Sequence, residues 1–526
     1  MMQIWIKWKK KAINNLFSSL MIFLYLLFLI VAQNSINIDR KQPFSFILII
    51  SFICLLCTPC IVDKCKSFTL VIQKNSGCTK DKAKIFALIY LLSFLIQLVW
   101  LIGYYPGAMA NDNVDQLNQF LSKTLNDHHP ALHTILVLGI PYSLFHSLSC
   151  IILIQNLFFS LAFSYAFVTL YEYGCPKGYL ISMIALVLLN PFSSVMLLYP
   201  LKDTTMAILL LIAVTMFLKI YFSDGRWLTK INCLMLSIVL TIATIIRHNA
   251  ILFTGPLLLL LFMYTSRDFW KRIVLIFIYF IVFCWVVTIP IYQMFHVQET
   301  ASEHKIAEMY GLPMTVLGNV MIHNSDKLDD DTKDFLYEIG SLDEWKETYQ
   351  TGSWNSMKWA YGRGNDTIEQ KTKQELLEYF LDGIKASPAD SMIVVLELTN
   401  MVWSVDGKLD WYFLPTLVNN DLGFEAHGVS FIQNILRYYW EYSRYTILKY
   451  IYWFLGVYNL LFIVLGISKG IKKFGIVLPA LCYNFGTMLL LCGNDFRFFY
   501  YTYLIAPLLI FMLIFPKQTN SNLFYL

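Results

Sequence analysis

Acid–base side chains crowd one short stretch of this chain, residues 104–130, which follows a strongly apolar run. Asp112 and Asp115 lie three residues apart, so their carboxylates share one face if the stretch is helical. Two adjacent histidines, His128 and His129, follow. The chain is otherwise sparing with charge, and burial against apolar helices shifts the pKa values of such groups. We therefore expect acid–base chemistry here, in preference to an ordinary solvated loop.

Carboxylates and imidazoles are also metal ligands, so the stretch could hold a divalent cation. The candidate ligands are Asp112, Asp115, His128 and His129, whose spacing matches no specific ligand motif. A second pattern, C-x2-C-x2-C-x4-C, is formed by Cys54, Cys57, Cys60 and Cys65 and looks superficially like a cluster-binding run. Its first three cysteines lie in or beside an apolar run, where cysteine behaves as a small hydrophobic residue. We favour packing over metal binding for these cysteines, and no pattern requires a cofactor.

Charged and polar groups also mark three later breaks between apolar runs. They are Lys202 with Asp203, Arg247 with His248 and Asn249, and Arg497 within an aromatic stretch. Asp203 is expected to cap the next helix, whereas Lys202 could pair with a phosphate as a point charge. An arginine beside an imidazole among apolar residues usually faces a cavity or a partner, although it can also snorkel from an interfacial turn. Arg497 could bind an anion or anchor an aromatic belt.

Composition defines the setting for these groups. Of 526 residues, 57% are hydrophobic and only 14% are charged, against about a quarter charged in an ordinary soluble protein. Apolar runs of near-spanning length recur along most of the chain, which predicts an all-α polytopic membrane protein. A soluble enzyme, a disordered chain and a secreted disulfide scaffold are excluded. The net charge of +5 reflects short basic loops and indicates no nucleic-acid partner.

Basic residues set the expected orientation, because loops rich in Lys and Arg stay in the cytoplasm. Lysines at 7–11 precede a first apolar run at 16–32, which we interpret as a retained span, not a cleaved signal peptide. A second run covers 44–62 and is followed by a basic loop that includes Lys74 and Lys80. The third run, 85–103, then ends outside. This places the acid–base stretch, together with the breaks at 202, 247 and 497, on the outer face.

The number of spans follows from alternation of inside and outside loops. Between the outer stretch and the outer turn at 200–204 lie three apolar runs, 131–147, 149–171 and 179–199, where only two crossings fit. We expect the run 131–147 not to span the membrane, because Gly139 and Pro141 break it in the middle. The later runs alternate as far as Lys517, and the total is about twelve transmembrane helices.

The chain is expected to have three parts. Residues 1–293 form an N-terminal transmembrane module that carries the outer loop 104–130. Residues 294–444 are rich in Asp and Glu and lack a spanning run, so they are expected to form a mainly helical extracytoplasmic insertion. Residues 445–526 supply the C-terminal transmembrane helices.

The predicted sites share one face, and together they suit one task. A carboxylate there could remove a proton from an acceptor hydroxyl. Fixed cations could hold the phosphate of a lipid-linked donor and stabilise it as it leaves. The lipid tail would then lie among apolar helices.

The order of the motifs resembles the GT-C class of polytopic glycosyltransferases, which use polyprenyl-phosphate-linked sugars on the outer face of the membrane. The stretch from Pro106-Gly107 through Asp112 and Gln116 to His128-His129-Pro130 resembles a related group of bacterial membrane proteins. Those proteins also carry a Lys-Asp turn, an Arg-x-Asn break and a late Phe-Arg-Tyr-like motif, and here Lys202-Asp203, Arg247-His248-Asn249 and Phe496-Arg497-Phe498 correspond. The resemblance covers most of 85–265 and 490–516.

The resemblance implies that Asp112 is the catalytic acid, with Asp115 in reserve, and that Asp203 is the second acid. Substrate contacts would come from Gln116, His128, His129, Lys202, Arg247, His248, Asn249 and Arg497. The chain departs from the class in having two apolar runs before the motif loop, where the class usually has one. Its soluble part is also inserted before the last three spans and does not form a separate C-terminal domain, which leaves acceptor recognition open.

The leading hypothesis is a glycosyltransferase in a bacterial cell membrane, with a polyprenyl-phosphate sugar as donor and a surface glycan or lipid as acceptor. A flippase or transporter for lipid-linked glycans is the second, although it predicts charges spread through the depth of several spans. A polymerase or ligase for surface polysaccharide is the third, and the sequence does not separate it from a simple transferase.

Overall fold

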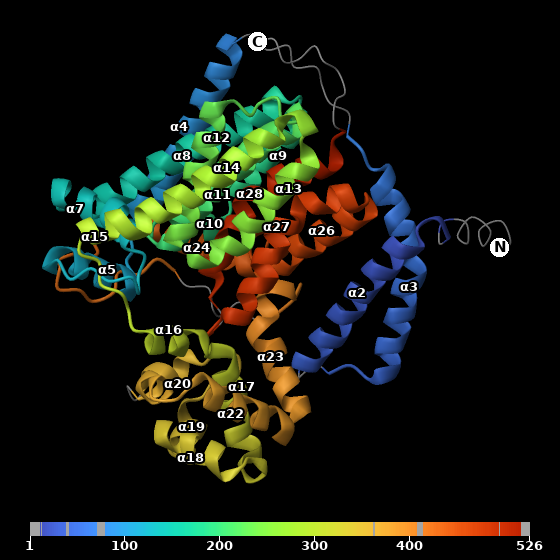
Figure 1. Cartoon of the computed structure of the whole chain (residues 1–526). Coiled ribbons are helices and arrows are strands. Elements are labelled where there is room, and N and C mark those ends of the chain that lie inside the picture. The colour runs from blue at the N-terminus through green and yellow to red at the C-terminus, as the bar shows by residue number, and fades with distance from the viewer. Residues whose placement is uncertain are drawn as a thin grey trace.

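The computed structural model describes residues 11, 13–37, 41–70, 79–360, 363–407, 414–493 and 495–516 (Figure 1). Within these ranges the regular structure is helical, and β-structure is limited to three isolated bridges. The predicted all-α class is therefore confirmed. Several lysines used to orient the chain lie outside the described residues, namely Lys7, Lys9, Lys10, Lys74 and Lys517.

Eight helical stretches of the described chain are long and apolar enough to cross a membrane, which makes this a multi-pass membrane protein. Their helices are α2 (Leu16–Ile36), α3 (Phe44–Ser67), α4 (Thr79–Gly103), α8 (Leu148–Glu172), α11 (Lys202–Ser223), α14 (Trp270–Val286), α27 (Ile471–Thr487) and α28 (Tyr500–Ile514). A bent pair, α9 (Lys177–Leu188) and α10 (Pro191–Leu197), adds a ninth crossing if it counts as one span. The described chain also has four shorter apolar helical stretches, which are one at 131–145 and those that contain α12 (Lys230–Ile246), α13 (Ile251–Tyr264) and α26 (Leu455–Ser468).

Burial separates central from peripheral helices. In α11 and in the stretch that includes α28, 83% of the most apolar window is buried, and these two helices pack on each other at the centre of the bundle (Figure 1). In the α14 stretch the buried share is 11%, and α2 and α3 are nearly as bare. Peripheral apolar side chains such as Phe52 and Ile281 are therefore free to face hydrocarbon, as expected of a helix that is apolar all round.

The run at 131–147 forms one short helix. It consists of α6 (Ala131–His133), a π-helical turn η2 (Thr134–Gly139) and α7 (Ile140–Phe145). The prediction that Gly139 and Pro141 break this run was wrong, because the chain continues from the π-helical turn directly into α7, whose first turn contains the proline. Gly139 instead makes room for a neighbour: a Cβ there would lie 2.4 Å from the ring of Phe120.

The break falls instead between α9 and α10, which are bent by 56°. Asn190 caps α10 by accepting a hydrogen bond from the backbone N–H of Phe192 at 3.0 Å, and Pro191 starts the helix. Proline is disfavoured inside a helix and favoured at its first position, so Asn-Pro ends α9 and starts α10.

The helix that carries Asp112 is α5 (Asn111–Ser122), which lies at one end of the bundle (Figure 1). The chain leaves α4 and passes through Gly107, whose φ is +124°. The N–H of Ala108 then bonds to the carbonyl of Leu198 at 3.1 Å, and Met109 pairs with residues 416–418. This turn therefore fixes where α5 begins.

Replacing Gly107 with alanine is expected to destabilise the protein by about 1–3 kcal/mol, the cost of a strained backbone, and to lower its activity by displacing α5. A Cβ at this position would lie 1.8 Å from Cδ1 of Ile152. Thermal unfolding of the purified protein measures the first effect. The matched control is Gly178→Ala, because a Cβ at Gly178 meets nothing within 4 Å. Equal unfolding temperatures for the two variants would contradict this role.

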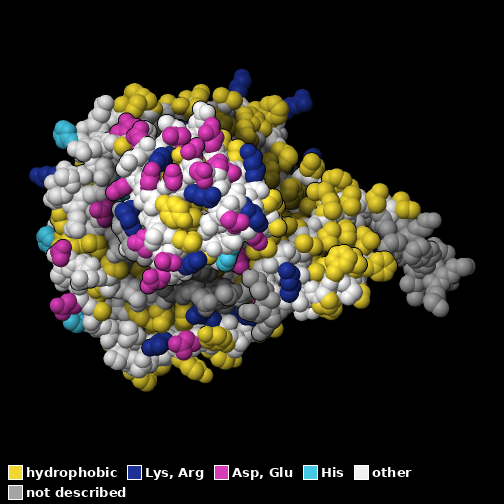
Figure 2. Space-filling model, turned by 90° about the horizontal axis from the view of Figure 1, so that it is seen from below, with side chains coloured by type: hydrophobic (Ala, Val, Ile, Leu, Met, Phe, Trp, Pro, Cys, Tyr) yellow, Lys and Arg dark blue, Asp and Glu magenta, His cyan; other side chains and the backbone are white. Residues whose placement is uncertain are grey.

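Within residues 294–444 the structure has a compact helical domain with its own core. Its helices are α16 (Ser302–Met309), α17 (Gly311–Asn324), α18 (Asp330–Ile339), α19 (Leu342–Thr348), α20 (Asn355–Ala360), α21 (Gly364–Glu369) and α22 (Lys373–Ala386). Met314, Phe335 and Trp345 are among its fully buried core residues. Figure 2 shows acidic and basic side chains over this domain, whereas apolar side chains dominate the flank formed by α2 and α3.

The rest of this segment returns to the bundle. Helix α23 (Pro388–Trp403) runs from α17 to α26, and residues 414–429 then pass beside the start of α5, where the N–H of Val418 bonds to the carbonyl of Met109 at 3.2 Å. Helix α24 (Ser430–Tyr445) packs on α4. The domain is thus attached at both ends to the part of the bundle that positions α5.

Candidate active site

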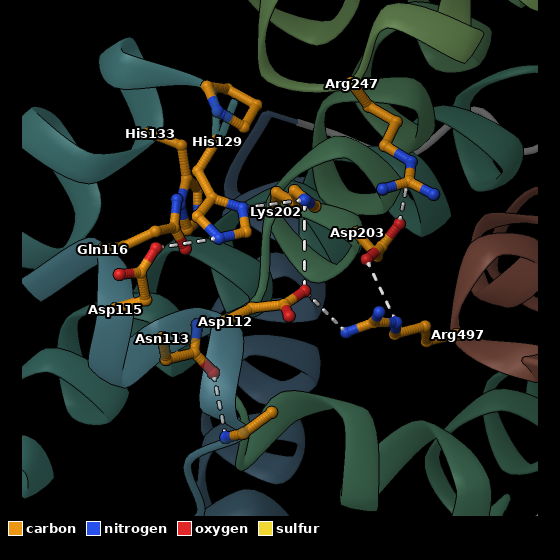
Figure 3. Close-up of polar contacts among 12 residues, drawn as sticks. Asp112, Asn113, Asp115, Gln116, His129, His133, Lys202, Asp203, Arg247 and Arg497 are labelled. Carbon is orange, nitrogen blue, oxygen red and sulfur yellow. Dashed lines mark hydrogen bonds and ion pairs between the residues drawn. The ribbon is translucent and has the colours of Figure 1, made fainter. Parts of the chain in front are cut away.

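Asp112 lies in the first turn of α5 and contacts two cations from distant parts of the chain (Figure 3). The Nη1 atom of Arg497 donates a hydrogen bond to Oδ2 of Asp112 at 3.1 Å. The Nζ atom of Lys202, at the start of α11, lies 3.9 Å from the same oxygen. Arg497 belongs to the short helix η8 (Phe496–Phe499) that leads into α28. Three segments that are far apart in sequence therefore meet at one carboxylate oxygen.

A second carboxylate, Asp203, lies behind this contact and is fully buried. Its Oδ1 is 3.2 Å from Nε of Arg247, and its Oδ2 is 3.9 Å from Nε of Arg497. The guanidinium of Arg247 also stacks on the ring of Phe498, 4.0 Å from the ring centre. Asp203 was expected to cap a helix, and it does lie in the first turn of α11, but it also bridges two arginines.

The contacts continue on the other side of Lys202. Its Nζ lies 3.3 Å from Nδ1 of His129, and Nε2 of the same ring lies 3.2 Å from Oδ2 of Asp115. The side-chain amide of Gln119, one turn further along α5, donates a hydrogen bond to Oδ2 of Asp115 at 2.8 Å. The result is a continuous series of contacts, which we call the ion-pair chain: Asp115, His129, Lys202, Asp112, Arg497, Asp203 and Arg247 (Figure 3).

Charge in the ion-pair chain is nearly balanced. Asp495, two residues before Arg497, adds a fourth carboxylate at 2.6 Å from the Nε of Arg497. Asp115 pairs with His129, and the other three carboxylates, Asp112, Asp203 and Asp495, surround the three cations Lys202, Arg247 and Arg497. Burial alone would raise the pKa of Asp112, but the charges of Arg497 and Lys202 outweigh it and hold that pKa well below its usual range. Burial and then the charge of Lys202 lower the pKa of His129 to about 3, so its imidazole is neutral at pH 7.

The other predicted residues have different surroundings. Gln116 is buried and donates to Oγ1 of Thr134 at 3.0 Å, so it fixes α5 to the helix at 131–145 and does not face the ion-pair chain. His248 is exposed and Asn249 is half-buried, and within the described part of the protein neither joins the chain. The ring of His128 lies between those of His129 and His304 of α16, with ring centres 4.7 and 4.8 Å away and in tilted and edge-on contact, respectively. It therefore links the chain to the helical domain.

The same junction contains an ion pair that the sequence did not suggest. Asp127 accepts a hydrogen bond from the backbone N–H of Thr300 at 2.6 Å and contacts Nζ of Lys305 at 2.9 Å. These contacts fasten the loop before the helix at 131–145 to α16. Asp495 belongs to the Asp-Phe-Arg stretch that the sequence places with the other groups on the outer face, but it was assigned no role of its own. An acid two residues from an arginine, in a C-terminal region almost free of charge, was the available signal.

The predicted metal ligands do not converge. Asp112 faces the cations, whereas Asp115 pairs with His129. Cys54, Cys57 and Cys60 are spread along α3. Over the ranges that the structure covers, no group of three or more His, Cys, Asp or Glu side chains is arranged to hold a metal ion.

Comparison with known proteins finds a match to a model described as a family of unknown function, DUF6020, over residues 121–360. The matched segment includes Lys202, Asp203, Arg247 and most of the helical domain, but neither Asp112 nor Arg497. No curated protein and no solved structure matches the chain. Over just under half of its length, then, the chain is similar to a family whose function is unknown.

Proposed function

We propose that the protein is a glycosyltransferase of GT-C type in a bacterial cell membrane. Its donor is a sugar linked to a polyprenyl phosphate, and its acceptor is a surface glycan or lipid. The observation that supports this most is that Lys202 and Arg497 converge on the carboxylate of Asp112 in α5, at one end of an apolar bundle. This carboxylate remains 30% exposed. A base and phosphate-binding cations are thereby adjacent.

The proposed reaction is a single displacement at the anomeric carbon of the donor. The acceptor hydroxyl oxygen forms the new bond to this carbon while the bond to the phosphate oxygen breaks. The hydroxyl proton passes to the carboxylate of Asp112, and the electron pair of the broken bond leaves with the polyprenyl phosphate. The phosphate gains one negative charge in this step, so fixed cations stabilise the transition state more than the bound donor.

Lys202 and Arg497 are the cations placed to hold the phosphate, because both already contact Asp112. Arg247 would act from the far side of Asp203, which holds it at 3.2 Å. We assign Asp203 the role of fixing the two arginines, since its carboxylate is fully buried. Asp115 would then position the neutral imidazole of His129, whose other nitrogen faces Lys202.

The proposed topology has about twelve crossings. The eight long apolar stretches, the bent pair α9–α10 and the shorter helices α12, α13 and α26 supply them, and the helix at 131–145 lies at the surface. α5, the ion-pair chain and the helical domain would share the outer face. The domain is then adjacent to the acceptor side of Asp112, through His128 and His304.

The experiment that tests the proposal is mass analysis of surface glycans and lipid-linked sugars from cells with and without the protein. A transferase predicts loss of one sugar decoration and accumulation of its polyprenyl-phosphate donor. Loss of long-chain product instead would indicate a polymerase or ligase. Unchanged surface glycans and unchanged lipid-linked sugars would refute the proposal.

A topology map separates a transferase on the outer face from a transporter. Epitopes inserted in the loop between α18 and α19 should be accessible from outside intact cells. An epitope accessible only after the cytoplasmic membrane is opened would place the helical domain, and Asp112 with it, on the wrong side.

A further inference from the structure

Both cations at Asp112 converge on the same oxygen. Arg497 Nη1 lies 3.1 Å and Lys202 Nζ lies 3.9 Å from Oδ2. Two positively charged donor groups that meet at one acceptor oxygen form an anion site, and guanidinium and ammonium groups donate hydrogen bonds to carboxylate and phosphoryl oxygens alike. In the structure this anion site is filled by a side chain of the protein itself.

The charge balance of the site leaves little room for a second anion. Three carboxylates already neutralise the three cations, so a phosphate added to the present arrangement would create a net negative cluster. Asp203 cannot leave, because it is fully buried between two arginines. Asp495 is held to Arg497 twice, by an ion pair at 2.6 Å and by the backbone N–H at 3.2 Å. Asp112 is 30% exposed and Asp495 is 27% exposed, but only Asp495 is also held by the backbone of Arg497, so Asp112 is the carboxylate we expect to turn away.

We propose that Oδ2 of Asp112 occupies the position of a phosphoryl oxygen, and that a phosphate ligand displaces this carboxylate from Lys202 and Arg497 when it binds. The identity of the ligand as the donor phosphate rests on the proposed function. The resting protein is therefore held in a self-occupied state, and the ligand both fills the anion site and releases the carboxylate.

The displacement has a chemical consequence. While two cations hold it, the carboxylate is a weak proton acceptor, because protonation would break both contacts. Once the phosphate has taken over the cations and lies close by, the pKa of Asp112 rises toward its usual range. The base thus gains strength only when a donor is bound.

Binding of undecaprenyl phosphate without sugar tests this directly. The full-length protein, purified in detergent, is titrated with phosphatidylcholine vesicles that contain undecaprenyl phosphate, and inorganic phosphate is used as a soluble competitor. Asp112→Asn should bind the lipid phosphate on the order of ten-fold more tightly than the wild type, since the ligand no longer competes with a carboxylate. Inorganic phosphate should compete with the lipid in both proteins.

Glu299→Gln is the matched control, because it also removes one negative charge near α16, from a side chain that is 89% exposed and pairs with Lys305 at 3.7 Å, outside the ion-pair chain. Its affinity for the lipid phosphate should stay within about twofold of the wild type. Equal gains in Asp112→Asn and Glu299→Gln would show mere charge repulsion and overturn the inference, as would no gain in Asp112→Asn. A gain that inorganic phosphate cannot compete away would identify the lipid chain, not the phosphoryl group, as the ligand.

The pH dependence of the wild-type enzyme is a second readout that needs no variant. The acid limb of kcat/KM reports the free enzyme, in which Asp112 is paired, and the acid limb of kcat reports the donor complex. A carboxylate with a low pKa keeps its base form to lower pH, so the limb of kcat should lie at higher pH than that of kcat/KM. Coincident limbs would overturn the inference.

Inactivity of Asp112→Asn without tighter binding would also overturn the inference but leave the proposed function standing. Wild-type turnover by that variant would remove the proposed function.

Discussion

Replacing Asp112 with asparagine is expected to slow sugar transfer by about 1,000-fold, a value within the range for removal of a general base. Asparagine has the shape of aspartate and still accepts a hydrogen bond from Arg497 through its side-chain oxygen, so α5 should stay in place. It cannot take up the acceptor proton. The measurement is release of polyprenyl phosphate by the purified protein in vesicles that contain the donor and acceptor.

Asp115→Asn in the same assay shows which carboxylate is the base. Its side chain is 54% exposed and pairs with His129, so its loss should reduce turnover far less than loss of Asp112. The reverse order of the two effects would exchange their roles, and wild-type turnover by Asp112→Asn would remove the central assignment.

Arg497→Ala is expected to have the largest effect on stability. Arg497 contacts three carboxylates, Asp112, Asp203 and Asp495, and its own side chain is only 19% exposed. Removing one partner from a buried ion pair typically costs about 3–5 kcal/mol, because a charge is left uncompensated in a poorly solvated place. We expect a marked fall in the thermal unfolding temperature together with loss of activity.

Two further variants show whether the effect of Arg497→Ala comes from its buried ion pairs. Arg437→Ala on α24 removes an arginine that is 62% exposed and pairs with Glu441 one turn away, so its unfolding temperature should stay close to that of the wild type. Arg497→Lys keeps the charge but loses the planar fork, so it should recover part of the stability and little of the activity. If Arg497→Ala unfolds at the wild-type temperature, Arg497 does not hold the buried carboxylates.

The fold class could be predicted because long apolar runs without charge form membrane-spanning helices, in which every backbone polar group is hydrogen-bonded within the helix. Much of the site could be predicted for a related reason. A chain so poor in charge must compensate the few charges that lie next to apolar helices, and Asp112, Lys202, Asp203, Arg247 and Arg497 do compensate one another. The breaks between runs therefore indicated which residues meet, without indicating which pairs form.

Other features depend on contacts that no local pattern contains. The position of the bend was misjudged because Pro141 and Pro191 look equally disruptive in the sequence. The helix continues through Pro141 by way of the π-helical turn, whereas Asn190-Pro191 ends one helix and starts the next. Gln116 was expected to face a substrate but is directed toward Thr134 by the packing of α5. The junction between Asp127 and Lys305 joins residues nearly two hundred positions apart, and no spacing rule predicts such a pair.

The most direct test of the central claim is an experimental structure of the protein with a polyprenyl-phosphate sugar, or an unreactive analogue of it, bound from a lipid environment. We expect phosphate oxygens within hydrogen-bond distance of Lys202 Nζ and the guanidinium of Arg497, with the carboxylate of Asp112 turned away from both and directed at the anomeric carbon. A bound donor whose phosphate lies elsewhere, with Asp112 still paired to Arg497, would contradict it.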